Sequence, residues 1–405
     1  MVFKSSTSLL RRCLSSTRGS HTGSFYTAQQ RKRPIISPVG QLDSIKACFQ
    51  LRSMMSTSAA LKVTQDSDSI SDVDWDNLGF KTRETDQMFI MKCDTDGEWH
   101  RGQLEPFGLL EVSPSAGVLN YGQGIFEGLK AYRTTDGRSL LFRPEENAKR
   151  MIFGAERMCM PAPSVDTFVD AVKQTVLANK RWVPPVGKGS LYVRPLLIGT
   201  GPVLGLSKSP EYTFLVYAAP VGDYFKEGPA PIHLKVESMY SRAVHGGTGG
   251  VKTICNYAPV LKAQLTAKKE GFTDVLYLDA LERKYLEEVS SCNIFIVKDN
   301  VIATPEAKGC VLPGITRKCI LELAQSLGYK VEERKVDVDE LMDADEAFCT
   351  GTAVVVSPVG SVTHRGTRVL FSNSGVKRVS SIFYKFLTDL QMGRTADTRG
   401  WTTEV

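Results

Sequence analysis

Apolar residues recur at helical spacing in two stretches of the first half of the chain. The spacing predicts a helix over residues 146–158 and a second over 164–182, which begins at the capping residue Ser164. The expected core faces consist of Ala148, Met151, Ile152 and Ala155 in the first helix and of Phe168, Ala171, Val172 and Val176 in the second.

Shorter apolar runs predict strands around these helices. Three of them, 140–144, 190–199 and 212–221, belong to the first half of the chain. In the second half, such runs alternate with helical patterns over 258–271, which Gly271 would cap, and over 315–328. The strand-like runs of the second half are 232–239, 274–280, 292–300, 301–305, 329–336 and 346–362.

The order of these elements predicts a mixed fold, α/β (α+β), in two domains. Residues 222–231 contain Gly, Pro and charged side chains between apolar runs, which is typical of an interdomain linker. The linker divides a smaller domain, 75–221, from a larger one, 232–393.

Residues 1–60 differ from the rest of the chain in charge. They contain nine basic residues and one acidic residue, are rich in Ser and Thr, and lack a sustained core periodicity. These features predict an organelle transit peptide, with a basic tail that stays attached as the alternative. The segment contributes +8 to a chain total of +6 and leaves −2 for the remainder, so the main argument for nucleic-acid binding disappears. No apolar run approaches the roughly 18 residues of a membrane span, and we expect none.

Cysteine and histidine usage argues against disulfide and metal chemistry. Nine cysteines are scattered without a CxxC pair, and two of them, Cys13 and Cys48, lie in the predicted transit peptide. The five histidines form no cluster in the sequence. We therefore expect reduced cysteines and no metal site.

The stretch GGTGGVK, residues 246–252, is the first candidate for chemistry. Four glycines within five residues require unusual backbone angles or a very close approach of the chain to another group. A phosphate-binding P-loop needs Lys directly after the last Gly, and here Val251 intervenes. Lys252 is therefore a solvated loop lysine or a reactive amine.

A reactive amine of the Schiff-base type needs partners. For pyridoxal phosphate these are a carboxylate for the ring nitrogen, a donor for the phenolic oxygen, and a helix N-terminus with a cation for the phosphate. From Glu288 onward the chain reads EVSSCNIF, then IAT at 302–304 and LPGITR at 312–317. This ordered set resembles the signature of class-IV aminotransferases, which are pyridoxal-phosphate enzymes of fold type IV.

Further blocks sharpen the resemblance to branched-chain amino-acid aminotransferases of plant organelles. They include NYGQGIFEGLKAYR (120–133), GSLYVRPLLIG (189–199) and FCTGTAVVV (348–356), and the similarity covers about residues 75 to 393. D-amino-acid aminotransferases and aminodeoxychorismate lyases share the Lys and Glu elements, but the 120–133 and 189–199 blocks favour the branched-chain family.

The resemblance implies a role for each residue that matches a family motif. Lys252 would form the Schiff base with pyridoxal 5′-phosphate and act as general acid and base, Glu288 would contact the ring nitrogen, and Tyr257 would contact the phenolic oxygen. Each has a plain alternative as an ordinary surface or core residue, and only their joint spacing favours the site. The resemblance implies that the cofactor phosphate is contacted by Arg143, Ile315, Thr316 and Thr352. It implies that the substrate is contacted by Tyr121, Phe126, Tyr192, Arg194 and the Ala353 amide. Thr352 would also contact the substrate carboxylate beside that amide.

The implied activity is reversible amino transfer from Leu, Ile or Val to 2-oxoglutarate. The implied partners are these small molecules and a second copy of the chain in a homodimer, with neither nucleic acid nor membrane. Lys4 and the run LLRRCL favour a mitochondrial address, with a plastid as the alternative because the body resembles plastid-type members equally well.

Overall fold

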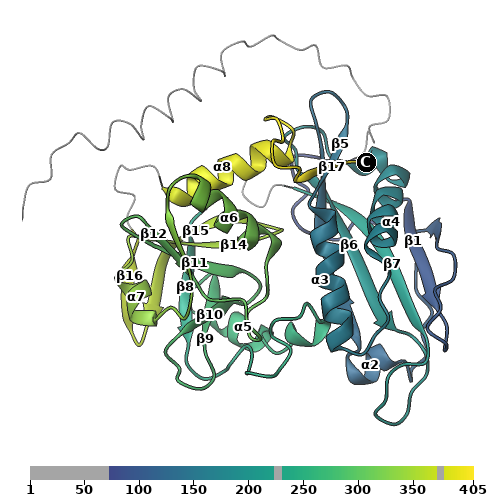
Figure 1. Ribbon diagram of the computed structural model, residues 1–405, viewed down its shortest axis with the longest axis horizontal. Helices are drawn as coiled ribbons and strands as arrows, with labels where there is room; N and C mark the ends of the chain where they lie inside the picture. Colours follow the sequence, from purple (N-terminus) through teal and green to yellow (C-terminus); the bar gives the residue numbers. More distant parts are fainter. Residues whose placement is uncertain (1–72, 223–229, 372–377) are drawn as a thin grey trace, which may run out of the picture. The chain divides into compact units, whose positions relative to one another are not determined.

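Two β-sheets organise the chain in the computed structural model, which describes residues 73–222, 230–371 and 378–405 (Figure 1). The described residues belong to one compact unit. The predicted transit peptide at 1–60 lies outside the described residues, as do residues 223–229 of the predicted linker. Among the helices that are described, none is long and apolar enough to cross a membrane.

The first sheet is antiparallel throughout and has the order β17-β5-β4-β6-β7-β1-β2, with β3 paired to β6. Its longest pair joins β6 (Ser190–Gly199) and β7 (Tyr212–Val221), two strands that the sequence predicts with the same bounds. The other elements here are β1 (Gln87–Cys93), β2 (Gln103–Pro106), α2 (Gly117–Tyr121), β3 (Gly124–Phe126), β4 (Leu129–Arg133), β5 (Ser139–Phe142) and β17 (Thr402–Glu404).

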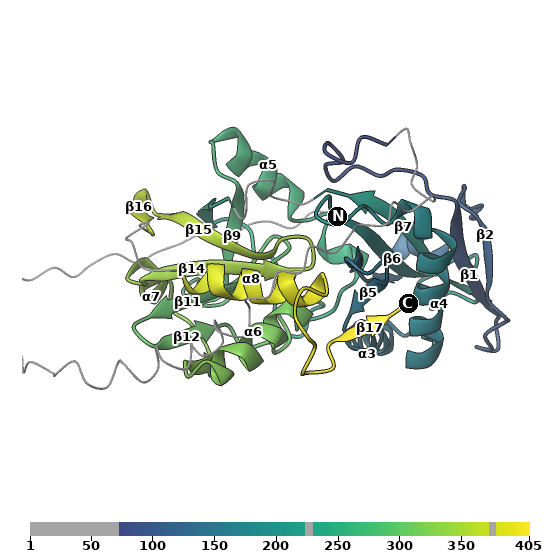
Figure 2. The ribbon, with the colours of Figure 1, turned by 90° about the horizontal axis from the view of Figure 1, so that it is seen from above.

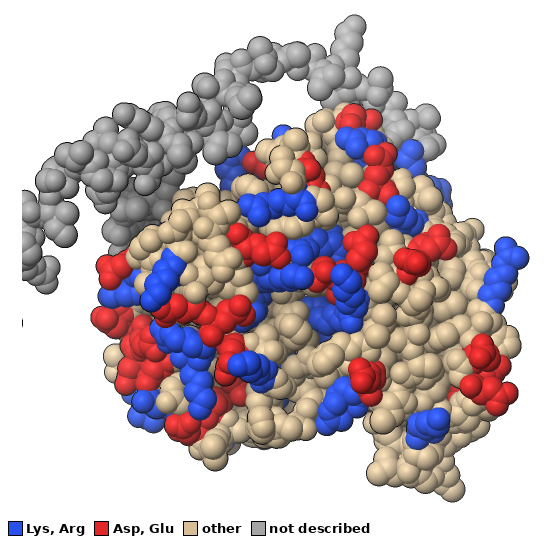
Figure 3. All heavy atoms as spheres, in the orientation of Figure 1, with Lys and Arg blue, Asp and Glu red and all other residues tan. Residues whose placement is uncertain are grey.

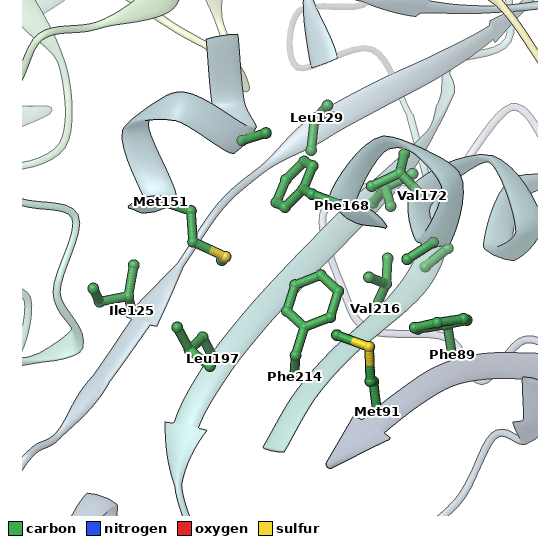
Figure 4. Packing of buried hydrophobic residues seen from close by; sticks show 14 of the residues in the cluster. Phe89, Met91, Ile125, Leu129, Met151, Phe168, Val172, Leu197, Phe214 and Val216 are labelled. Atoms are coloured by element: carbon green, nitrogen blue, oxygen red, sulfur yellow. The ribbon is translucent and has the colours of Figure 1, made fainter. Parts of the chain in front are cut away.

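Helices α3 (Pro144–Arg157) and α4 (Val165–Ala178) pack on this sheet. Ser164 caps α4 as predicted, since its side chain accepts the Thr167 N–H at 3.2 Å. In the core that the helices share with the sheet, Met151 and Phe168 lie among strand residues (Figure 4). The apolar pattern places Ile152 there as well, but its side chain is 36% exposed. The buried face of α3 is rotated relative to the pattern, because Asn147, Arg150 and Gly154 are buried and Ile152 is not.

The second sheet has the order β10-β9-β8-β15-β14-β11-β12-β13, with β16 paired to β15. Strand β10 also pairs with β11, through Glu288 opposite Asn293, so that six strands close into a ring. The strands are β8 (Ile232–Glu237), β9 (Asp274–Leu278), β10 (Leu286–Val289), β11 (Asn293–Lys298), β12 (Val301–Thr304), β13 (Lys330–Glu333), β14 (Glu346–Gly351), β15 (Val355–His364) and β16 (Thr367–Leu370).

Helices α6 (Ile315–Ser326) and α8 (Val379–Gln391) pack along the second sheet (Figures 1 and 2). Their shared core includes the stacked rings of Phe295 and Phe348, whose centroids lie 5.0 Å apart.

The predicted helix over 164–182 is shorter than expected, because after α4 the chain tightens into the 3-10 turn η2 (Lys180–Trp182). The remaining helical elements are α5 (Leu261–Lys269), which lies within the predicted 258–271, α7 (Val338–Met342) and the 3-10 turn η3 (Ile254–Asn256).

After α8 the chain returns to the first sheet, where β17 pairs with the edge strand β5. Trp401 is buried there, with its ring 5.9 Å from that of Phe142. The predicted larger domain ends at residue 393 and does not anticipate this return. Apart from β17, the strands of the first sheet precede residues 222–231 and those of the second sheet follow them, and the division into two domains stays a prediction.

Candidate active site

Lys252 is attached through its backbone to the first sheet. Its carbonyl accepts the Phe126 N–H at 3.2 Å, and the next residue, Thr253, forms a bridge with Ile125. The Lys252 amine donates to the Tyr257 hydroxyl at 3.2 Å and lies 4.7 Å from the centre of the Phe126 ring. The amine is therefore held between two aromatic side chains, which a solvated loop lysine would not be.

The glycines before Lys252 permit close backbone contact. A Cβ at Gly249 would lie 2.5 Å from the Cys310 carbonyl oxygen, and the Gly250 N–H donates to the Gly309 carbonyl at 2.6 Å. Val251, the residue that disrupts the P-loop pattern, is buried in the core of the first sheet. Residues 249–251 thus fix Lys252 against the 309–310 segment and the first sheet together.

The Lys252 side chain borders a cavity of about 690 Å³. Phe126 and Tyr257 form an edge-to-face pair on its wall with ring centroids 4.8 Å apart. Tyr192 and Arg194 both line it, as strand alternation predicts. The predicted site residues on this cavity are Phe126, Tyr192, Arg194, Lys252, Tyr257, Thr352 and Ala353.

Arg194 is held by aromatic groups. Its guanidinium lies 4.8 Å from the Phe126 ring centre and donates to the Tyr192 hydroxyl at 3.2 Å. Its Nε is buried and has no hydrogen-bond partner among the described residues. A donor of this kind is available to an anionic ligand.

Glu288 is almost completely buried, with 1% of its surface exposed. Arg242 forms an ion pair with it at 3.1 Å, and the Leu312 N–H donates to its other oxygen. Burial raises the pKa of Glu288, whereas the charge of Arg242, the Leu312 N–H and the charge of Lys252 each lower it. Glu288 therefore lies within electrostatic reach of the Lys252 amine.

Helix α6 begins at Gly314 without a side-chain cap or an acidic residue in its first turn. Its first residues, Ile315 and Thr316, border a cavity of about 30 Å³ together with Thr352. Only glycine fits at 314, because a Cβ there would lie 2.0 Å from Asn293 Oδ1. An uncapped helix start offers backbone N–H donors to an anion.

The structure does not bring Arg143 to this helix start. Its guanidinium pairs with Glu322 at 3.2 Å, farther along α6, and lies 5.0 Å from the Trp401 ring. Arg143 borders neither the 690 Å³ cavity nor the 30 Å³ cavity. The predicted phosphate contact of Arg143 is corrected on these grounds.

Arg150 is a second basic residue close to the helix start, although it too borders neither cavity. Its side chain is 8% exposed, forms a two-pronged ion pair with Glu127 at 2.7 and 2.8 Å, and donates to the Pro313 carbonyl at 3.2 Å, just before α6. Sequence reasoning missed it, although a signal was present. Arg150 falls one position before Met151 on the core side of α3, where an unpaired cation would be costly.

Tyr121 also lies apart from the cavity. Its ring is 38% exposed, and its hydroxyl donates to the Leu204 carbonyl. Phe80, by contrast, lines the cavity and contacts the Tyr192 ring at 5.5 Å. Only the predicted position of the folded start, near residues 72–80, pointed toward Phe80.

The amino-transferase class IV family model matches residues 124–362, which is more than half of the chain. The chain belongs to the class IV aminotransferases.

Plant relatives of this aminotransferase cover most of its length. Branched-chain amino acid aminotransferase 2, chloroplastic, from Humulus lupulus is 66% identical over 336 residues, 83% of this chain and 82% of that protein. Branched-chain amino acid aminotransferase 1, mitochondrial, from the same species is 59% identical over 335 residues, 83% of this chain and 85% of that protein. The chain is thus a member of the branched-chain aminotransferase family, as its motifs predicted.

A solved relative has the same fold. A T.th. branched-chain amino acid aminotransferase with pyridoxamine 5′-phosphate is 28% identical, with a TM-score of 0.68, and the match covers 79% of this chain and 99% of that one. The predicted fold class, α/β (α+β) of fold type IV, is confirmed.

The turn at 352–354 joins the two sheets of the aminotransferase at the cavity. The Thr352 hydroxyl donates to the Gly128 carbonyl at 3.2 Å, and Lys130 Nζ donates to the Ala353 carbonyl at 2.8 Å. Val355, which follows the turn, has a φ of 57°, an unusual value for a β-branched residue. The two bonds to β4 and its preceding loop hold this strained turn against the site.

The thiol of Cys292, in the cavity near Lys252, is unreactive at neutral pH. Burial raises the pKa of the Cys292 thiol, which lines the cavity, to about 12, so the thiol stays protonated at neutral pH. All seven cysteines of the described residues are free. Within the described ranges, no group of His, Cys, Asp and Glu side chains is arranged to hold a metal ion.

Glu287, the neighbour of Glu288, is a second buried carboxylate, with 5% of its surface exposed. Burial raises its pKa to about 7, a hydrogen bond from Cys310 and the charge of Arg242 oppose this rise, and Glu288 adds to it. Because this pKa lies above the ordinary 4.5, the folded chain binds the proton more tightly than the unfolded chain. Stability from this group is present below about pH 4.5 and is lost as the pH rises through about 7.

Glu287→Gln should therefore remove the loss of folding stability that occurs as the pH rises through about 7. We expect its free energy of unfolding, relative to the parent, to increase between about pH 4.5 and pH 8 by about 3 kcal/mol, at 1.4 kcal/mol per pH unit. Urea unfolding across this range measures the difference. Glu111→Gln, at an exposed carboxylate, is the matched control, and parallel stability curves for Glu287→Gln and the parent would contradict the pKa of Glu287.

Proposed function

We propose that this aminotransferase reversibly moves the amino group of leucine, isoleucine or valine to 2-oxoglutarate, giving branched 2-oxo acids and glutamate, with pyridoxal 5′-phosphate as its cofactor. The observation that carries the proposal is the Lys252 amine at 3.2 Å from the Tyr257 hydroxyl, in an aromatic cavity with Glu288 buried nearby. The names of the plant relatives and the pyridoxamine 5′-phosphate of the solved relative support it.

The residues present fit pyridoxal 5′-phosphate. Its phosphate matches the uncapped start of α6, where Ile315, Thr316, Thr352 and Arg150 would hold it. Its ring nitrogen matches the buried carboxylate of Glu288, and its phenolic oxygen matches the Tyr257 hydroxyl. When bound, the cofactor supplies a carbonyl group for amines and an electron-withdrawing ring.

The chain contributes positioning and proton transfer. Lys252 takes the proton from the substrate α-carbon and later returns a proton, and Tyr257 holds the amine in place between these events. Glu288, paired with Arg242, would as a carboxylate accept a hydrogen bond from the ring nitrogen and favour a proton on that atom. The Thr352–Ala353 turn would offer the amide of Ala353 to the substrate carboxylate, and the Thr352 hydroxyl would donate there only on leaving the Gly128 carbonyl.

The cavity suits two kinds of side chain. Phe80, Phe126 and Tyr192 provide apolar walls for a branched aliphatic group. Arg194, whose Nε has no partner among the described residues, would pair with the second carboxylate of glutamate or 2-oxoglutarate. The predicted substrate contact of Tyr121 remains a prediction, because that side chain does not border the cavity of its own chain.

We infer that two copies of the chain associate as a homodimer. Large apolar side chains are exposed close to Tyr121 in the sequence and at its hydrogen-bond partner: Leu119 is 60% exposed, Leu204 93% and Leu206 86%. Exposed apolar groups of this kind are typical of a protein interface. On the face shown in Figure 3, basic side chains are interspersed with acidic ones.

Lys252→Ala should lower turnover by about 10³-fold or more, because Lys252 is the amine that the Tyr257 hydroxyl and the Phe126 ring hold in place to move the proton. Leucine-dependent conversion of 2-oxoglutarate to glutamate measures it, and mass spectrometry after borohydride reduction should find no cofactor attached at residue 252. Lys269→Ala, an exposed neighbour on α5, should retain parent activity. Near-normal turnover of Lys252→Ala would refute the proposed role.

Arg150→Met should weaken pyridoxal 5′-phosphate binding by about 10- to 100-fold, the value of a charge-assisted hydrogen bond. Arg143→Met is the matched control and should change the affinity by less than about 3-fold, since Arg143 pairs with Glu322 instead. Equilibrium dialysis gives both values. Glu127→Gln combined with Arg150→Met avoids a buried unpaired carboxylate, and parent affinity in that double variant would contradict the assignment.

Arg194→Ala should raise the KM for glutamate and 2-oxoglutarate by about 10- to 100-fold, through loss of a charged hydrogen bond, and that for leucine much less. Steady-state kinetics with each substrate as the varied component measures the split. Equal losses for the two substrate types would argue against a carboxylate contact.

We propose that the protein acts in an organelle, which the chloroplastic and mitochondrial names of its relatives support. Residues 1–60, with Lys4 and LLRRCL, favour the mitochondrion, and the plastid is the alternative. A fluorescent reporter fused to residues 1–60 should co-localise with a mitochondrial marker in plant cells. Plastid fluorescence would reverse the choice, and diffuse fluorescence would contradict an organelle address.

A further inference from the structure

Arg242 lies in the loop after β8 and does not border the cavity. Its side chain and that of Glu288 are each only 2% exposed, and the two pair at 3.1 Å. Its other terminal nitrogen donates to the Cys310 carbonyl at 3.2 Å. A guanidinium buried to this degree would be costly unless the carboxylate were ionised opposite it.

The orientation of Glu288 is fixed from several sides. Strand β10 is held between β9 and β11, and Glu288 itself forms the pair that closes the ring of strands. The Leu312 N–H donates to one carboxylate oxygen, while the Leu312 carbonyl accepts from Asn293 Nδ2 at 2.9 Å. Arg242 is the cation in direct contact with the carboxylate, while the charges of Lys252 and Arg317 act on it more weakly, so Arg242 influences the charge of Glu288 as well as its direction.

Glu287 is a second buried carboxylate near this guanidinium. Neighbouring residues of a strand point to opposite sides, yet the charge of Arg242 acts on both carboxylates. The ionisable groups near Glu287 are Cys310, Arg242, Glu288 and Asp279. Among the described residues Arg242 is ion-paired with Glu288 and not with Glu287, and Arg242 Nε and Glu287 Oε2 are both buried without a hydrogen-bond partner, so a shift of the guanidinium toward Glu287 would weaken its pair with Glu288.

Resting on the proposed function, we propose that Arg242 is a positioning residue that keeps Glu288 ionised, so that the shared proton stays on the ring nitrogen of the cofactor, and that ionised Glu287 competes for the same guanidinium. Without Arg242 the carboxylate becomes the stronger base and takes the proton from the ring nitrogen. The ring then withdraws electrons less strongly. The proton moves from the ring nitrogen to Glu288, so the combined charge of these two groups and their number of protons do not change.

The first test reads the protonation of the ring nitrogen directly. Holoenzyme is loaded with pyridoxal 5′-phosphate labelled with ¹⁵N in the ring, and its ¹⁵N resonance is recorded for the parent and for Arg242→Gln. We expect the variant to move to the unprotonated position, as Glu288→Gln does, with kcat lower by about 10- to 100-fold and KM changed little. Arg242→Lys, which keeps the charge, should restore the protonated resonance, and Arg181→Gln, at an exposed ion pair, should match the parent.

A protonated ring nitrogen in Arg242→Gln, with kcat within about twofold of the parent, overturns the proposal. If Arg242→Gln does not fold, the double variant Arg242→Gln with Glu287→Gln is used, because it removes one buried carboxylate. The ¹⁵N resonance of its ring nitrogen then tests the proposal in the same way. Failure of the proposed function is distinguishable, because the parent would then neither attach the cofactor at Lys252 nor convert leucine.

The second test concerns Glu287. The visible absorbance of the bound cofactor is titrated between about pH 5.5 and pH 8.5 in the parent and in Glu287→Gln. We expect a step in the parent near the pKa of Glu287, about 7, and none in the variant. A step that persists unchanged in Glu287→Gln overturns the competition for Arg242, and so does the absence of a step in both chains, which is the result expected if Glu287 acts only structurally.

Discussion

A carboxylate buried at the closing pair of a ring of strands is the constraint on which the site depends. Glu288 requires a cation and an N–H donor, and these come from the loop after β8 and the segment before α6. The same two segments are joined again where Gly250 donates to Gly309. Satisfying one buried charge therefore also sets the distance between Lys252 and the start of α6, because both lie within a few residues of these contacts.

Local patterns predicted most of the fold. Short apolar runs gave β6 and β7 with correct bounds, and Ser164 marked the start of α4. Motif spacing led to Lys252, Tyr257 and Glu288, which the structure brings together although up to 36 residues separate them. These features depend on neighbours in sequence or on a spacing that the family resemblance supplies, so one chain is enough to find them.

Features that depend on distant contacts were missed. The sequence alone does not distinguish Arg143, at a strand end, from Arg150, on a helix face. Their contacts do, because Arg150 pairs with Glu127 and donates to Pro313, whereas Arg143 pairs with Glu322. The apolar pattern could not tell that Gly154 would be buried and Ile152 would not. The closure of β10 on β11 rests on one residue pair, which leaves no periodic trace, and with it Arg242 stayed hidden.

The return of the chain from the second sheet to the first has a consequence for biosynthesis. Strand β5 leads directly into α3, and among the described residues its outer edge is covered by β17 and by the Val405 N–H, which donates to the Ser139 carbonyl. An uncovered strand edge is a template for wrong pairing. Because synthesis runs from the N-terminus, the first sheet keeps this edge open until residues 402–405 have been made. The first sheet thus begins to form first and is completed last. Until β17 pairs with β5, a nascent or newly imported chain needs protection of the β5 edge.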